Sequence, residues 1–228
     1  MTTRTALLAG ATGLVGGHLL TRLLADPRYT RVTVLVRRPL PLTHPGLTVR
    51  VVDFAELSGD SVGEADDVYC ALGTTIKKAG SQDRFRAVDQ HYTVAVARRA
   101  QEGGARRLAL CSSIGADPGA RSFYLRVKGD TEREVSALGY EQTEVFRPSL
   151  LLGHRTENRP GERLMTALAP VVTPLCAGPL RPYRPVSADR LAAAMIASLV
   201  TGTPGTRVHT WRAITALAAD RSAGRGPR

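Results

Sequence analysis

The stretch LLAGATGLVG, residues 7 to 16, decides the fold of this chain. An apolar run ends in glycines spaced three apart, and a helical pattern of apolar residues follows at once. This order predicts a strand, a tight turn and the start of a helix. Gly10 allows the chain to turn sharply, Gly13 places no Cβ in front of a ligand, and Gly16 allows the helix to lie close to its strand.

The start of this predicted helix suits an anion. Unpaired backbone N–H groups and the positive end of the helix dipole converge there, as the diphosphate of a dinucleotide requires. A glycine-rich turn without a ligand is the alternative, because a glycine triplet by itself is a weak signal. The cofactor contacts expected from this segment are Gly10, Thr12, Gly13, Leu14, Val15 and Gly16.

Length and cysteine content favour a single α/β domain in the cytoplasm. The chain has 228 residues, and no apolar run approaches the ~18 residues of a membrane span. Its start shows no basic region followed by an apolar segment, so export is not expected. Cys70, Cys111 and Cys176 form no CxxC pair, and their odd number argues against a disulfide framework. We therefore expect reduced thiols and no metal site.

The formal net charge of +11 raises the question of nucleic-acid binding. The only lysines are Lys77, Lys78 and Lys128, and the arginines are scattered along the chain without interleaved aromatic residues. This pattern favours a solvated basic surface over a nucleic-acid partner. An anionic cofactor needs only a few of these charges.

Apolar and β-branched runs that alternate with helical patterns predict an α/β fold. We expect a single Rossmann-type, doubly wound parallel sheet with helices on both faces. Helical patterns lie at residues 85–102 and 122–138. The strands after the first are expected at residues 31–36, 47–52, 67–72, 107–111 and 143–146.

The domain is expected to span residues 1–220. Within it, residues 152–185 are rich in proline and glycine, which predicts a lid or substrate-side insertion. The other expectations are a mobile polar loop at 76–84, a helix capped by Ser187, a short strand at 208–211 with a short helix after it, and a disordered tail at 221–228.

Open parallel sheets bind ligands beyond the carboxyl ends of their strands. Gly10, Arg37, Asp53 and Gly73 would all lie at that edge, so one ligand is expected to touch all four. The expected cofactor contacts outside the glycine segment are Arg37, Arg38, Asp53, Phe54, Leu72, Gly73, Thr74 and Pro148.

Arg37 and Arg38 follow the second strand, where a dinucleotide fold places the adenosine ribose. A guanidinium grips a phosphate bidentately, so the pair favours NADPH over NADH; a solvated turn is the alternative. Asp53 can accept a hydrogen bond from the adenine amino group, with Phe54 beside it. Capping of the following turn is an equally good interpretation of Asp53.

Three side chains have the chemistry of a carbonyl–alcohol interconversion. Tyr124 and Lys128 are four residues apart and share one helix face, where an ammonium favours the phenolate form of a tyrosine. Ser113 follows the neighbouring strand and can hold the substrate oxygen. A surface contact is the alternative for the tyrosine–lysine pair, and a turn or cap for the serine.

Several segments together resemble the short-chain dehydrogenase/reductases, in their extended or atypical branch. The glycine segment, YLRVK at 124–128 and RPS at 147–149 match the superfamily. CALGTT at 70–75, SSIGA at 112–116 and FRP at 146–148 resemble the Tat-interacting-protein oxidoreductase subgroup. The resemblance extends from about residue 5 to residue 200.

The resemblance implies a Rossmann fold and NADPH held by the glycine segment, Arg37 and Arg38. It implies Tyr124 as catalytic acid/base, and Lys128 as its partner and as a ribose ligand. Asp89 stands where many members have asparagine, and the part after Arg147 is short. The expected function is hydride transfer between nicotinamide and a small carbonyl or alcohol. The alternative is an NADPH-sensing regulator with a protein partner; a homo-oligomer is compatible with both.

Overall fold

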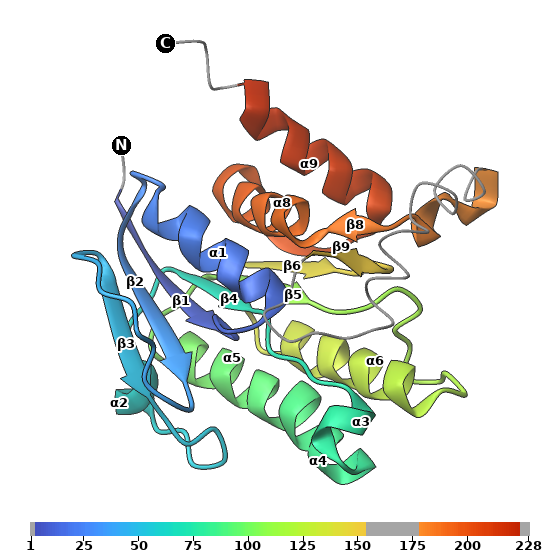
Figure 1. The fold of residues 1–228 in the computed structure, drawn as a ribbon, viewed down its shortest axis with the longest axis horizontal. Coiled ribbons are helices and arrows are strands. Elements are labelled where there is room, and N and C mark those ends of the chain that lie inside the picture. Colours follow the sequence, from blue (N-terminus) through green and yellow to red (C-terminus); the bar gives the residue numbers. More distant parts are fainter. Residues whose placement is uncertain (1–2, 154–177, 224–228) are drawn as a thin grey trace.

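The computed structural model describes residues 3–153 and 178–223, and it contains a parallel seven-stranded sheet (Figure 1). The strand order is β3-β2-β1-β4-β5-β6-β9, so the chain winds outward in both directions from β1. The strands are β1 (Arg4–Ala9), β2 (Tyr29–Val36), β3 (Leu47–Val51), β4 (Asp67–Cys70), β5 (Arg107–Cys111), β6 (Gln142–Phe146) and β9 (Gly205–His209).

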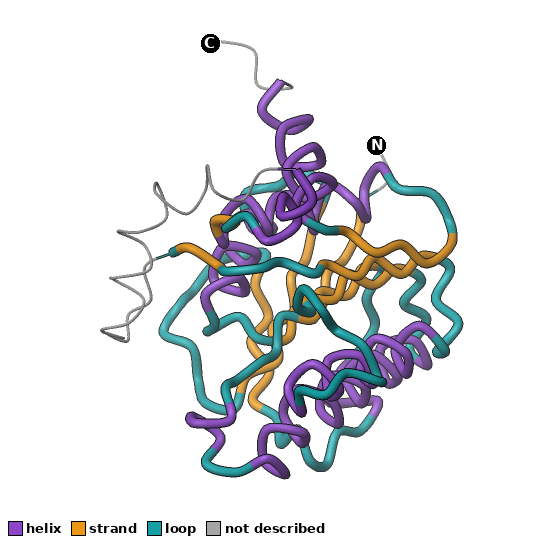
Figure 2. Tube along the Cα trace, turned by 90° about the vertical axis from the view of Figure 1, so that its right-hand side faces the viewer, coloured by secondary structure: helices purple, strands orange, loops and turns teal. Residues whose placement is uncertain are grey.

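Helices cover both faces of the sheet (Figures 1 and 2). On β1, Leu8 belongs to one apolar core while Leu7 and Ala9 belong to the other, as the two-residue period of a strand requires. The predicted fold class is therefore confirmed. The first face carries α1 (Leu14–Leu24), α8 (Ala188–Thr201) and α9 (Trp211–Ala223), and the second carries α5 (Thr93–Glu102) and α6 (Phe123–Ser136).

The prediction of a mobile polar loop at 76–84 is wrong. The segment forms the short helices α3 (Ile76–Ala79) and α4 (Gln82–Arg86). Each has a side-chain cap: the Thr75 hydroxyl accepts the Lys78 N–H, and the Ser81 hydroxyl accepts the Arg84 N–H. Capping satisfies donors that a short helix leaves open, which is why these residues are helical.

The helix predicted at 85–102 is interrupted. A π-helix, η1 (Ala87–Tyr92), lies between α4 and α5. The helix capped by Ser187 is confirmed, since the Ser187 hydroxyl accepts the Arg190 N–H at the start of α8. The last strand begins at Gly205, earlier than the predicted residue 208.

The remaining elements concern the predicted lid and tail. β7 (Leu151–Leu152) pairs with β8 (Val186–Ser187) and joins the two ends of the lid segment. Residues 154–177, most of that segment and including Cys176, lie outside the described residues. Helix α9 continues to residue 223, beyond the predicted start of the tail, and residues 224–228 lie outside the described part. The other short elements are α2 (Gly59–Val62) and a 3₁₀ helix, η2 (Gly178–Tyr183).

Cys70 and Cys111 are free thiols, and burial raises the pKa of both. Within the described ranges, no helix combines the length and apolar character that crossing a bilayer requires.

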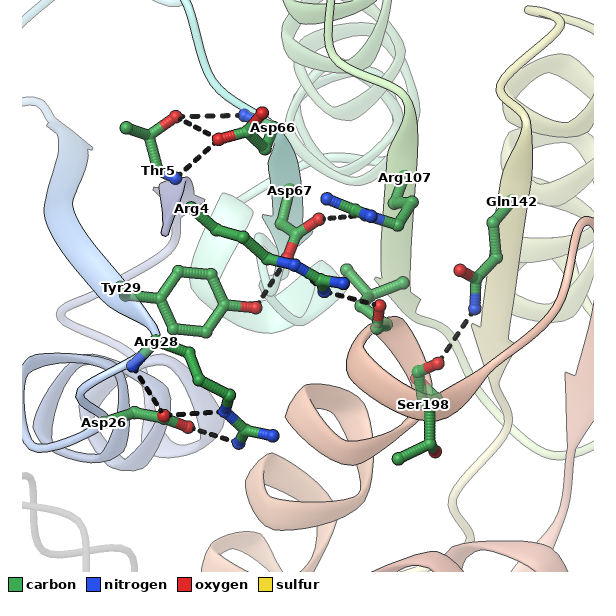
Figure 3. Close-up of polar contacts among 12 residues, drawn as sticks. Arg4, Thr5, Asp26, Arg28, Tyr29, Asp66, Asp67, Arg107, Gln142 and Ser198 are labelled. Carbon is green, nitrogen blue, oxygen red and sulfur yellow. Dashed lines mark hydrogen bonds and ion pairs between the residues drawn. The ribbon is translucent and has the colours of Figure 1, made fainter. Parts of the chain in front are cut away.

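A buried polar network ties the amino ends of the strands together (Figure 3). Asp67, fully buried, accepts a 2.5 Å hydrogen bond from the Tyr29 hydroxyl and pairs with Arg107 and with Arg4. Burial and the Asp67 charge raise the pKa of Tyr29, so this phenol stays protonated and donates. Arg4 also donates to the Leu199 carbonyl at 2.9 Å, which attaches α8 to this edge.

We predict that Asp67→Asn destabilises the fold without altering the opposite edge of the sheet. The substitution leaves the guanidiniums of Arg4 and Arg107 without their shared counter-ion, which costs about 3 kcal/mol. Chemical denaturation monitored by circular dichroism measures the loss. Asp60→Asn, at the exposed start of α2, is the control and should change stability by less than about 0.5 kcal/mol.

Candidate functional site

The glycine loop brings three backbone segments into close contact. Gly10 has a φ of +95°, and a Cβ there would overlap the Ala71 carbonyl that follows β4. A Cβ on Gly16 would overlap the carbonyl of Gly10. Gly10 therefore makes the expected sharp turn, while Gly16 allows α1 to approach the loop that follows β1.

The start of α1 is open to an anion. Gly13 is the N-cap residue, no side chain caps the helix, and the first turn contains no acidic residue. The first N–H groups of a helix have no partner within it. Together with the helix dipole, they form a site for a negatively charged group.

Two cavities meet at this loop, with volumes of about 750 Å³ and about 540 Å³. Both lie along the carboxyl ends of the strands, and the glycine loop and the segment after β4 contribute to both. The two therefore form one groove across that edge of the sheet. The shared lining residues are Thr12, Gly13, Ala71, Leu72, Gly73, Thr74 and Lys78.

The smaller cavity contains most of the residues expected at the adenosine end. Arg37, Asp53 and Phe54 line it, whereas Arg38 does not. Asp53 Oδ1 accepts the Ala55 N–H at 2.9 Å, as turn capping requires, and the same residue also lines the cavity, so its adenine contact stays a prediction. Among the described residues, Arg37 forms no ion pair.

The larger cavity contains the predicted tyrosine–lysine pair. Tyr124 and Lys128 both line it, and no described group hydrogen-bonds the Tyr124 hydroxyl. Lys128 is 6% exposed, and its Nζ lies 2.7 Å from Asp89 Oδ1. Burial, the largest single effect, opposes the charge of Lys128, but Asp89 together with Tyr124 and Cys111 raises the pKa of the lysine above its ordinary value. The ammonium is therefore retained at neutral pH.

The two serines after β5 differ in position. Ser112 lines the larger cavity, and its hydroxyl donates to Glu132 of α6. Arg147 holds the same carboxylate with two donors, at 2.6 Å from Nη2 and 3.0 Å from Nε. Ser113 lies outside both linings, and within the described part of the chain it donates only a long, 3.4 Å bond to the Ile114 carbonyl. Its role stays a prediction.

Of the expected contacts, Gly16, Arg38 and Pro148 also lie outside the two linings, while Gly10, Leu14 and Val15 lie within them. Several lining residues are absent from the sequence-based prediction. The capping residues Thr75 and Ser81 could have indicated the short helices α3 and α4. The spacing of residues 14, 17, 18 and 21 could have indicated that one face of α1 lines the cavity. The missed lining residues include His18, Thr21, Tyr92 and Ser112.

No cluster of histidine, cysteine and acidic side chains within the described residues could hold a metal ion. The chemistry available at this groove comes from the Tyr124 hydroxyl, the Lys128 ammonium and the open helix start. These are the groups of an anion-binding site with a proton donor beside it.

Comparison with known proteins identifies the class. Residues 10–163 match a family described as NAD(P)H-binding. The chain belongs to this family of NAD(P)H-binding, atypical short-chain dehydrogenase/reductase proteins.

Its relatives include Protein HTATIP2 of Rattus norvegicus, 37% identical over 174 residues, or 72% of this chain and 69% of the relative. Protein fmp52, mitochondrial, of Aspergillus niger is 36% identical over 181 residues, or 75% of this chain and 76% of the relative.

Solved structures with this fold include MoeE5 in complex with UDP-glucose and NAD. It is aligned over 96% of this chain and 82% of its own, with a TM-score of 0.69 and 18% identity. UDP-glucuronic acid 4-epimerase from Bacillus cereus, in complex with NAD, is aligned over 90% of this chain and 77% of its own, with a TM-score of 0.66 and 14% identity. At these identities, the likeness shows the Rossmann-like fold alone.

We predict opposite effects for alanine at two adjacent glycines of α1. Gly16→Ala forces a Cβ into the Gly10 carbonyl and should cost about 2 kcal/mol of stability. Gly17→Ala is the matched control, because its Cβ would lie 3.7 Å from the Ala11 carbonyl, an ordinary contact. It should add about 0.5 kcal/mol by favouring the helix. Thermal unfolding followed by circular dichroism measures both; equal effects would contradict the assigned role of Gly16.

Proposed function

We propose that this chain is an NADPH-dependent oxidoreductase that reduces a small carbonyl or oxidises the corresponding alcohol. The observation that supports this most is the common wall of the two cavities. One groove joins an open helix start to the Tyr124 hydroxyl and the buried Lys128 ammonium. A dinucleotide needs this combination: an anion site in the middle and a proton donor at one end.

The residues fit such a cofactor. Gly10 and Gly16 allow the loop, α1 and the segment after β4 to approach one another closely, and Gly13 leaves the helix start uncapped. We assign the adenosine half to the smaller cavity, near Asp53, and the nicotinamide half to the larger one, near Lys128. The solved structures named above contain NAD by their descriptions.

The preference for NADPH rests on Arg37. This guanidinium lines the smaller cavity at the end of β2 and forms no ion pair within the described part of the chain. A free guanidinium matches a phosphate monoester in charge and geometry, whereas NADH offers only a ribose hydroxyl there. Arg38 would add to the same positive field from outside the lining.

The reaction requires little beyond these side chains. Bound NADPH supplies a hydride to the carbonyl carbon. The Tyr124 hydroxyl gives a proton to the carbonyl oxygen, which completes the alcohol and leaves a phenolate. The Lys128 ammonium favours that phenolate and binds the cofactor ribose. A serine after β5 would hold the substrate oxygen, and both Ser112 and Ser113 are available for this role.

The cysteines are the basis for a proposed cellular location. Free Cys70 and Cys111 suit a reducing compartment, and we propose the cytoplasm. The fungal relatives carry the word mitochondrial in their names, so fractionation of the source cells is the deciding measurement. A small carbonyl or alcohol is the proposed partner of the site, and no nucleic acid is required.

We predict that Arg37→Gln weakens NADPH binding about tenfold and leaves NADH binding within about threefold, because a charged hydrogen bond is lost only with the phosphate. Fluorescence titration with each nucleotide measures the ratio. Arg98→Gln, on the exposed face of α5, removes the same charge at a distance and is the matched control. Equal loss for both nucleotides would contradict the phosphate assignment.

We predict that Tyr124→Phe lowers NADPH oxidation at least about 100-fold across a panel of small carbonyls, because the proton donor is removed. The affinity for NADPH should stay within about threefold, since only the hydroxyl is lost. Tyr183→Phe, at an exposed tyrosine, is the control. Tight NADPH binding without turnover in the unmodified protein would exclude the reductase and favour a cofactor-sensing role.

A further inference from the structure

The carboxylate of Asp89 lies at the junction of three elements. It is 1% exposed and belongs to the π-helix η1. Its Oδ2 accepts the Thr74 N–H at 2.8 Å, and its Oδ1 lies 2.7 Å from Lys128 Nζ. Its carbonyl lies 3.2 Å from the Thr131 hydroxyl, which also donates to the Val127 carbonyl at 2.7 Å. One residue thus connects the segment after β4 with helix α6.

The π-helix places Asp89 at this junction. A π-helical segment inserts an extra residue into a helix. It changes the direction of the side chains around it and the hydrogen-bond partners of its carbonyl groups. Here the Asp89 carbonyl is hydrogen-bonded from the neighbouring helix α6. The side chain of Asp89 therefore holds α6 at Lys128, and its carbonyl contacts the same helix at Thr131.

The position of this ion pair distinguishes it from a purely structural one. Asp89 and Lys128 both line the larger cavity, as do Gly73 and Thr74. A Cβ on Gly73 would lie 3.5 Å from Asp89 Oδ1 and 3.8 Å from Lys128 Nζ, so the backbone runs directly over the pair. Asp89 Oδ1 contacts the Lys128 ammonium at 2.7 Å, so the ion pair itself forms part of the cavity wall.

We propose that Asp89 is a positioning residue that fixes the Lys128 ammonium and the Gly73–Thr74 backbone relative to one another, so that both reach the nicotinamide half of the cofactor in one geometry. This inference rests on the proposed function. Asp89 acts through Lys128 and Thr74 and takes no part in proton transfer.

Three ionisable groups act on Lys128 from the elements around it. Asp89 faces it from η1, Tyr124 from one turn earlier in α6, and Cys111 from the end of β5. Burial disfavours the ammonium, and Asp89 makes the largest opposing contribution. Removing this carboxylate leaves a buried ammonium without its closest counter-ion, which must lower the pKa of the lysine.

The first test needs no cofactor. The chain has only three lysines, so ¹⁵N-lysine NMR gives a spectrum in which Lys128 is assigned by its absence in Lys128→Met. We expect Asp89→Asn to lower the titration midpoint of Lys128 by at least about one pH unit, and Asp89→Glu to restore part of the shift. Asp67→Asn, which removes an equally buried carboxylate at the opposite edge, should leave it unchanged. An unchanged midpoint in Asp89→Asn would overturn the proposal.

The second test measures NADPH affinity as a double-mutant cycle. We expect Asp89→Asn and Lys128→Met each to weaken binding about tenfold, and the double variant to be no weaker than Lys128→Met. Additive losses would overturn the proposal, because Asp89 would then act independently of Lys128. Asp67→Asn should lower stability and keep its affinity. Absence of NADPH binding in the unmodified protein would instead refute the proposed function, and the NMR result would still test the Asp89–Lys128 contact.

Discussion

The close approach of backbone at the glycine loop is the constraint on which the rest of the structure depends. The Gly10 position leaves no room for a side chain beside the Ala71 carbonyl, and Gly16 leaves none beside Gly10. β1, the start of α1 and the end of β4 are therefore held at van der Waals distance. This contact leaves the first N–H groups of α1 uncovered and gives the two cavities their common wall.

The two edges of the sheet use buried carboxylates differently. At the amino edge, Asp67 is enclosed by Arg4, Arg107 and Tyr29, so its charge is balanced within the protein (Figure 3). At the carboxyl edge, Asp89 forms an ion pair with Lys128, and both residues line the larger cavity. A buried ion pair contributes little net stability but is costly to break. This property allows Asp67 to hold strands together and Asp89 to hold Lys128 in place at the cavity.

Much of the fold was predictable because its signals are local. Apolar runs and glycine spacing gave the strands and the loop, and the i, i+4 spacing placed Tyr124 and Lys128 on one face. The Ser187 cap was also a local signal. The segment 76–84 was missed although Thr75 and Ser81 cap its helices, because two single-turn helices are too short to show periodicity.

The sequence by itself determined the main strands and long helices, the sharp turn at Gly10 and the shared helix face of Tyr124 and Lys128. Only the tertiary structure decided that Asp89 reaches Lys128, because the π-helix that carries Asp89 packs against α6, about forty residues later in the chain. It also decided that Ser112 rather than Ser113 faces the cavity. Glu132 on α6 accepts the Ser112 hydroxyl, and such a contact between distant segments leaves no periodic trace in the sequence.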